Sequence, residues 1–172
     1  MPQAEIDANL NSRKGPYLEL EVANAVKLVN IYGTGNTGNI NETTFILADM
    51  FGKAINKATN KPTGLPILYF KADTLVTAHD ASLYTGAGGD PETNIYDIED
   101  NWQVFNLPVL GTTDVYHPMR DDSAGYEQFY AATANPNFTS PIRPYRAESF
   151  ILMSAGKDGL YGTVDDVFNF EK

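Results

Sequence analysis

The chain of 172 residues contains no cysteine and few basic residues. Without cysteine it can form no disulfide, no thiolate nucleophile and no cysteine-based zinc or iron–sulfur site. Its 12 basic residues stand against 22 acidic ones, which gives a formal net charge of −10. This excess of negative charge disfavours contact with phosphate backbones or anionic lipid, so nucleic acid is not an expected partner.

Long apolar runs are also absent. The longest one is LPILYF, residues 65–70, far shorter than the ~20 residues that a membrane-spanning helix needs. The start of the chain lacks the basic-then-apolar pattern of a secretory signal. Hydrophobic residues make up 42% of the sequence, enough for one packed core. We therefore expect a single domain over residues 1–172.

Acidic residues concentrate in the middle of the chain. Residues 72–142 hold 1 basic and 11 acidic side chains, and they are rich in glycine, proline and asparagine, which are typical of turns. Burying unpaired carboxylates would cost several kcal/mol each. We therefore predict that 72–142 is a loop-rich elaboration at the periphery of the fold, and that a loop such as residues 86–94 can be replaced by a short linker.

Short strand patterns bounded by turn residues predict a small, mostly antiparallel sheet. They are Thr43–Leu47, Pro66–Lys71, Ser149–Met153 and Val167–Phe170. Residues 17–29 fit both a helical stripe and a strand alternation, and we favour the helix. Asp121 or Asp122 can cap a second helix that ends before Asn135-Pro136. Strands with one or two helices indicate an α+β fold.

A literal GxGxxG occurs at Gly33–Gly38 after an apolar run. A dinucleotide site needs the third glycine inside a helix, so that amides at its N-terminus meet the pyrophosphate. Here the residues after Gly38 are Asn39, Ile40, Asn41 and Glu42, and the chain does not alternate strand and helix. We favour a flexible Gly/Asn loop, with nucleotide binding as an alternative.

The two histidines, His79 and His117, lie near several aspartates, yet their spacing matches no metal-ligand pair. We expect both to be surface residues. The serines show no nucleophile-elbow context. The sequence therefore predicts no enzyme.

The most specific segment is Ser154–Asp166, SAGKDGLYGTVDD, which lies between two strand patterns. Calcium takes six to eight oxygen ligands, and a tight loop provides them by combining carboxylates with backbone carbonyls. The glycines let the backbone turn its carbonyls inward. Both terminal aspartates can face one ion only if the chain turns between them. The alternative is a hairpin loop with solvated acids.

The segment SFILMSAGKDGLYGTVDDVFNF, residues 149–170, resembles the C-terminal signature of pilin-like proteins related to the major pseudopilin of bacterial type II secretion. That signature is close to S-A-G-x-D-G-x-x-G-T-x-D-D-[IV]-x-N-[FWY]. Upstream, GPYLEL (15–20), LADMFGKA (47–54) and LPILYFKAD (65–73) resemble further segments of the family in the same order. These segments cover about a quarter of the chain.

The resemblance implies a pilin-like fold, with a small antiparallel sheet packed on a long N-terminal helix, and a calcium site in the C-terminal loop. The ligands carried over from the family are the side chains of Asp158 and Asp165, with Asp166 as a helper, and the carbonyls of Leu160 and Thr163. The family's hydrophobic N-terminal helix is absent from this sequence, and residues 72–142 exceed the usual loop.

The function implied is that of a structural subunit of a type II secretion pseudopilus or type IV pilus-like filament. The expected partners are other subunits, through the missing helix, and a secreted protein. The expected location is the periplasmic or extracellular face of a bacterial inner membrane, anchored only in the natural precursor. One alternative is a calcium-dependent extracellular binding module, and another is a nucleotide-binding protein that uses Gly33–Gly38.

Overall fold

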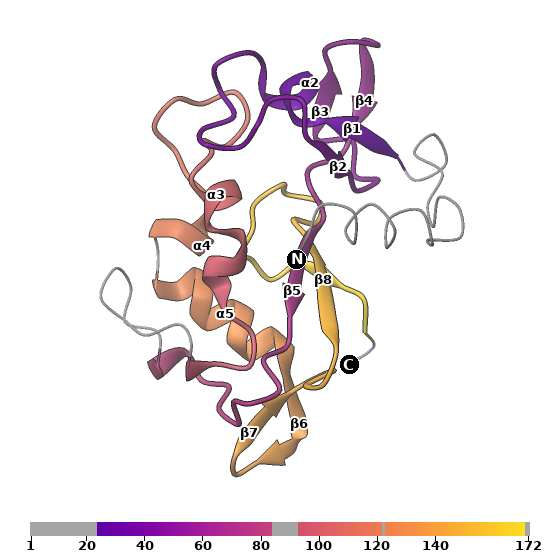
Figure 1. The fold of residues 1–172 in the computed structure, drawn as a ribbon. Helices are drawn as coiled ribbons and strands as arrows, with labels where there is room; N and C mark the ends of the chain where they lie inside the picture. Colours follow the sequence, from indigo (N-terminus) through magenta and orange to yellow (C-terminus); the bar gives the residue numbers. More distant parts are fainter. Residues whose placement is uncertain (1–23, 84–92, 122, 171–172) are drawn as a thin grey trace, which may run out of the picture.

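The computed structural model describes residues 24–83, 93–121 and 123–170. It combines small antiparallel sheets with a few short helices, as an α+β chain is expected to do (Figure 1). The elements, in chain order, are β1 (Ala25–Lys27), α2 (Leu28–Tyr32), β2 (Phe45–Leu47), β3 (Ala54–Asn56), β4 (Lys61–Thr63), β5 (Leu68–Lys71), η1 (Ala81–Leu83), η3 (Ile98–Asn101), α3 (Trp102–Phe105), α4 (Pro118–Asp121), α5 (Ser123–Thr133), β6 (Ala134–Thr139), β7 (Ile142–Pro144), β8 (Phe150–Ser154) and β9 (Val167–Phe168).

The central sheet has the strand order β5-β8-β9, and β1–β2, β3–β4 and β6–β7 form separate antiparallel pairs. The four predicted strand segments appear as β2, β5, β8 and β9, with ends shifted by a few residues. Along β5, Leu68 and Phe70 are buried while Tyr69 and Lys71 are exposed, as the two-residue period of a strand requires. Leu68 lies opposite Met153 of β8, so both strands give apolar side chains to one core.

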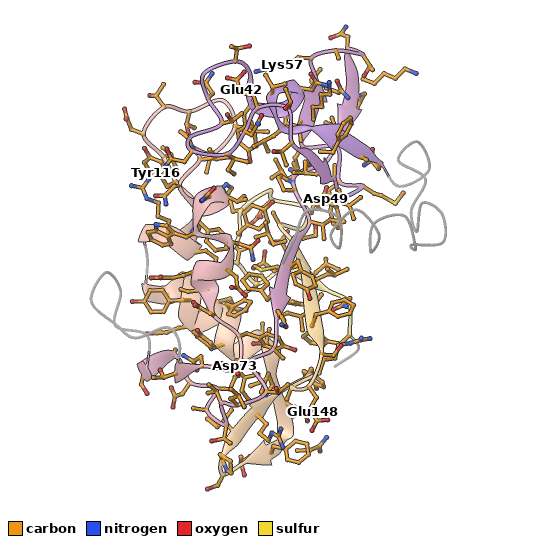
Figure 2. The ribbon with its side chains drawn as sticks, in the orientation of Figure 1. Glu42, Asp49, Lys57, Asp73, Tyr116 and Glu148 are labelled. Carbon is orange, nitrogen blue, oxygen red and sulfur yellow. The ribbon has the colours of Figure 1, made fainter. Side chains whose placement is uncertain are left out.

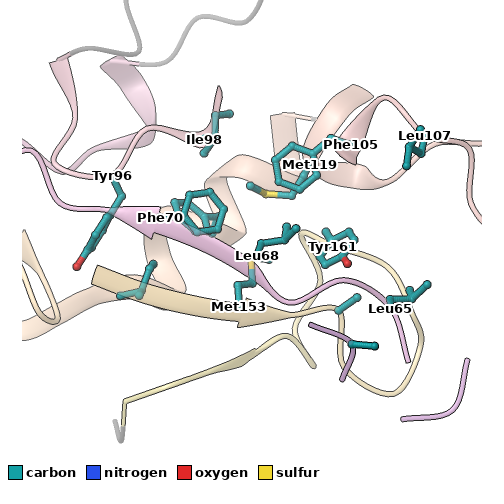
Figure 3. Packing of buried hydrophobic residues seen from close by; sticks show 14 of the residues in the cluster. Leu65, Leu68, Phe70, Tyr96, Ile98, Phe105, Leu107, Met119, Met153 and Tyr161 are labelled. Atoms are coloured by element: carbon teal, nitrogen blue, oxygen red, sulfur yellow. The ribbon is translucent and has the colours of Figure 1, made fainter. Parts of the chain in front are cut away.

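Helices α3, α4 and α5 lie on one side of β5 and β8 (Figure 1). Figure 3 shows Phe70 and Leu68 facing Phe105 and Met119 across this layer. The ring of Phe129 in α5 lies 4.9 Å from that of Phe70, centroid to centroid. The predicted helix after Asp121 is thus confirmed as α5, which ends at Thr133. This layer of helix on sheet is the base from which the C-terminal loop projects.

The prediction that residues 72–142 are peripheral is wrong. This segment supplies much of the buried core: Ile95, Tyr96, Ile98, Phe105, Leu107, Met119, Phe129 and Tyr130. Acidic residues of the same segment, such as Glu99 and Asp100, stay exposed. Among the described residues of this segment no acidic side chain is buried, so burial of the apolar ones leaves no unpaired carboxylate in the core.

The helix favoured for residues 17–29 is wrong at residues 24–27, and only Leu28 and Val29 of its described part are helical. Residues 17–23 lie outside the described residues, and Ala25–Lys27 form strand β1, which pairs with β2. Helix α2 begins only at Leu28 and ends at Tyr32. The strand forms because residues 25–27 find a partner strand about 20 residues later, a contact that local periodicity does not encode. Within the described ranges, no helix has both the length and the apolar character needed to cross a bilayer.

Candidate functional site

The predicted calcium loop, residues 155–166, leaves the central sheet at the end of β8 and returns to it at β9. Gly156, Gly159 and Gly162 all have positive φ angles, of 62°, 79° and 93°. A Cβ on Gly156 would lie 2.2 Å from the carbonyl oxygen of Asp165. The loop can therefore close on itself only with glycine at this position.

Asp165 ties the two ends of the loop together. Its Oδ2 accepts hydrogen bonds from the amides of Lys157 and Asp158, at 2.7 and 2.9 Å, and its Oδ1 accepts one from the Thr163 hydroxyl at 2.6 Å. The Thr163 bond is the largest cause that lowers the pKa of Asp165 to about 2, and the two amides act in the same direction. Asp158 Oδ1 accepts a bond from the amide of Leu160 at 2.8 Å.

Asp166 turns back into the loop from the adjacent position. Its Oδ2 accepts bonds from the amides of Gly162 and Thr163, both at 2.9 Å. Its Oδ1 is buried and has no hydrogen-bond partner in the described part of the chain. Burial raises the pKa of Asp166 to about 8, and the charges of Asp158 and Asp165 add to the rise while the two amides oppose it. Three carboxylates thus lie close enough to interact, and one oxygen lacks a partner.

The residues present provide the chemistry that a calcium ion needs. The Leu160 carbonyl lies 3.3 Å from the Thr163 hydroxyl, whose single proton goes to Asp165, and the Thr163 carbonyl accepts a long bond, 3.4 Å, from the Asp166 amide. Each carbonyl therefore keeps acceptor capacity for an ion. In residues 24–83, 93–121 and 123–170, no group of three His, Cys, Asp or Glu side chains already has metal-binding geometry. Coordination would thus need a side-chain rearrangement within the loop.

The inner side of the loop packs on the middle of the chain through Tyr161. Tyr161 is fully buried, and its hydroxyl donates a 2.5 Å hydrogen bond to the Pro66 carbonyl. Its amide donates to His117 Nδ1 at 3.3 Å, and the two rings stack edge to face at 4.8 Å. The Met119 amide in turn donates to the Tyr161 carbonyl at 3.1 Å. Sequence reasoning missed this support, because residues 117–119 carry no motif.

Both histidines are buried, so the prediction that they are surface residues is wrong. His79 is 2% exposed and His117 is 1% exposed. His79 Nε2 and the Thr133 hydroxyl share a hydrogen bond of 2.8 Å, and the same hydroxyl lies 2.8 Å from the Phe129 carbonyl. Burial lowers the pKa of each imidazole to about 4, so both are neutral at pH 7. Their apolar surroundings come from segments distant in sequence, and the local dipeptides gave no sign of them.

The Gly33–Gly38 segment follows helix α2 and leads through turns to strand β2. A dinucleotide site needs the opposite order, a strand before the glycines and a helix after them. Gly33, Gly35 and Gly38 all have positive φ angles, as expected of a glycine-rich loop. The geometry offers no helix N-terminus to a pyrophosphate at this place.

Comparisons of the chain with models of known protein families, with curated proteins and with solved structures found no match.

Proposed function

We propose that the chain is the headgroup of a pilin-like structural subunit, related to the major pseudopilin of bacterial type II secretion, with a calcium site in loop 155–166. The ligands of this site are the side chains of Asp158, Asp165 and Asp166 and the carbonyls of Leu160 and Thr163. The resemblance of residues 149–170 to the family signature supports the assignment. The position of the loop between two strands of an antiparallel sheet is consistent with it.

One observation carries the calcium site. Asp166 Oδ1 is buried beside two further carboxylates, and no described residue donates a hydrogen bond to it. A buried carboxylate oxygen without a partner is costly, and a bound cation removes that cost while it neutralises the repulsion among the three acids. When bound, the ion would supply charge neutralisation and a fixed loop conformation. The chain's own residues would hold it by their oxygens.

In this proposal the protein is not an enzyme. Its partners are other filament subunits, which it meets through a hydrophobic N-terminal helix of the natural precursor, and a secreted protein. The location follows from the same proposal: the periplasmic or extracellular face of a bacterial inner membrane.

Thermal unfolding with calcium or with excess chelator tests the ion site. A calcium concentration 100-fold above the dissociation constant stabilises the folded chain by about 2.7 kcal/mol. For a domain of this size, that corresponds to a rise in melting temperature of several degrees. Magnesium should substitute poorly, because it needs a smaller octahedral shell and keeps its waters. An unchanged melting temperature, with the metal shown to be removed by the chelator, would return the loop to an ordinary acidic hairpin.

Fractionation of the cells that naturally produce the chain tests the filament role. Antibodies against the purified chain should detect it in the membrane fraction and in filaments sheared from the cell surface. Chelation during growth should reduce the sheared fraction, because an unfolded headgroup cannot be assembled. A chain found only in the cytosolic fraction contradicts the role, even if calcium binds.

A further inference from the structure

A buried carboxylate outside the proposed ion site connects that site to a distant turn. Asp49 and Ser154 are 5% and 8% exposed. The Ser154 hydroxyl donates to Asp49 Oδ2 over 2.7 Å, although the two residues are 105 positions apart in the sequence. Hydrogen bonds from a hydroxyl to a carboxylate are among the strong ones in proteins. Figure 2 shows Asp49 between the β1–β2 pair and the central sheet.

Ser154 also contacts the loop. It is the last residue of β8, and its Oγ accepts a hydrogen bond from the amide of Gly156 at 3.4 Å. Gly156 packs directly on Asp165, since a Cβ on Gly156 would lie 2.8 Å from Asp165 Oδ2. The Ser154 hydroxyl can donate in one direction and accept in the other only while Asp49 is an acceptor.

On its other side, Asp49 organises the turn that precedes β3. Its Oδ1 accepts bonds from the amides of Phe51 and Leu65, at 3.0 and 3.3 Å. A Cβ on Gly64 would lie 2.1 Å from the same oxygen, so the carboxylate fills the space that this glycine leaves. The turn carries Met50, which is 94% exposed, and Phe51, which is 43% exposed. Burial raises the pKa of Tyr161, and the charges of Asp49 and Asp166 add to the rise, so both carboxylates lie near this one buried side chain.

We propose that Asp49 is a positioning residue of loop 155–166, and that through Ser154 it couples occupancy of the ion site to the order of the exposed apolar turn Asp49–Gly52. This inference rests on the proposed calcium site. It adds that the site controls a surface turn outside the loop. Coupling between two sites is reciprocal, so each end should respond to a change at the other.

Calcium titration by calorimetry tests the effect of Asp49 on the site. The dissociation constant should rise about tenfold or more in Asp49→Asn and in Ser154→Ala, as for removal of groups that orient metal ligands. In the asparagine variant the Nδ2 group faces the Ser154 hydroxyl as a donor and competes with the Gly156 amide. The double variant should bind calcium no more weakly than the weaker-binding single variant, since both changes break the same series of contacts.

Asp73→Asn is the matched control. Asp73 Oδ1 accepts a bond from the amide two residues later, Leu75, at 2.8 Å, as Asp49 Oδ1 does from Phe51. Asp73 is exposed and bonds to no residue of the loop. Its dissociation constant for calcium should equal that of the unchanged chain.

Hydrogen exchange tests the reciprocal effect. Calcium should slow exchange of the Phe51 and Leu65 amides in the unchanged chain, and not in Ser154→Ala. Ser154→Ala loses a single hydroxyl, so it keeps the test valid if Asp49→Asn fails to fold. If the variants are less stable in chelator but bind calcium with an unchanged dissociation constant, the Asp49–Ser154 bond is merely structural, and the proposal is overturned. If the unchanged chain binds no calcium, the ion site and this inference both fail. If it binds and both variants bind equally well, only the inference fails.

Discussion

At the residue scale, the adjacent acids Asp165 and Asp166 differ because their surroundings differ. Asp165 accepts three hydrogen bonds, which lower its pKa to about 2, whereas burial raises the pKa of Asp166 to about 8. The turn between them lets both carboxyl groups face the loop interior, which extended backbone would not allow. Of the two acids, Asp166 therefore pays the larger free-energy cost for its charged form, and a bound cation would reduce that cost.

Substitution of single acids in the loop should separate their contributions to calcium binding. Asp158→Ala and Asp165→Ala should abolish the calcium-dependent rise in melting temperature, and Asp166→Ala should remove part of it. Val164→Ala, at an 87% exposed loop position, is the control and should keep the full rise. Paired thermal scans in calcium and in chelator measure these differences. A full rise in Asp165→Ala would exclude its carboxylate as a ligand.

Asp166→Asn should raise stability without calcium and weaken the stabilisation that calcium gives. The folded-state pKa of Asp166 is raised, so the chain loses stability as pH increases from about 4 to about 8. The asparagine does not ionise. In chelator at pH 9 the variant should therefore be more stable than the unchanged chain, and in calcium its rise in melting temperature should be smaller. Equal stability of both chains in chelator at pH 9 would contradict the raised pKa.

The buried histidines should make the chain sensitive to mild acid. Burial lowers the pKa of His79 from 6.5 to about 4, so the unfolded chain binds a proton first as pH falls. The free energy of unfolding should drop between pH 6.5 and 4, by on the order of 3 kcal/mol for this group. Urea unfolding at several pH values measures the slope. His79→Gln, which keeps a donor for Thr133, should flatten it, and an unchanged slope would exclude His79 as its source.

At the element scale, the acidic middle region is held in the core by polar contacts as well as by apolar burial. Asn94 is 1% exposed, and its side chain exchanges two hydrogen bonds with the backbone of Asp80, at 2.8 and 3.2 Å. Ile95 and Tyr96 follow it directly into the core. Residues 86–94, which we expected to be replaceable, therefore end in a residue, Asn94, that ties the segment to the backbone of Asp80.

Asn94→Ala should lower the free energy of unfolding by about 2 kcal/mol, because it leaves the Asp80 amide and carbonyl unpaired in a half-buried place. A linker in place of residues 86–92, with Thr93 and Asn94 kept, should leave the fold intact. A linker that replaces residues 86–94 should lower the free energy of unfolding by as much as Asn94→Ala does. Chemical unfolding of the three chains measures this, and an equal stability for both linkers would assign Asn94 no such role.

At the scale of the whole molecule, charge and apolar surface are unevenly distributed. Residues 24–63 carry four lysines against two acids, while the net charge of the chain is −10. Exposed apolar side chains lie in the same part, among them Phe45, Met50, Phe51 and Ile55. In the proposed subunit the main assembly contacts belong to a helix of the precursor outside this chain, so these groups alone should support at most weak association.

The purified chain should therefore be monomeric or weakly associating. Light scattering after size exclusion, at two salt concentrations, measures its mass. A stable dimer, which needs the ~1,200–2,000 Å² of a specific interface, would contradict the view that assembly depends on the precursor's helix. Met50→Asp then shows whether residual association uses the apolar turn, with Leu75→Asp, 92% exposed outside that turn, as the control.

The sequence by itself determined the features that depend on neighbours along the chain. Short apolar runs bounded by turn residues predicted β5 and β8, the pattern from Asp121 to Asn135-Pro136 predicted α5, and the glycines predicted a turning loop between β8 and β9. Tertiary structure decided the rest, because each missed feature joins distant residues. The Asp49–Ser154 bond spans 105 positions, His79 meets Thr133 across 54, and β1 needs β2 as its partner. Local patterns specify which side chains can be buried, and only the packed fold specifies what they meet there.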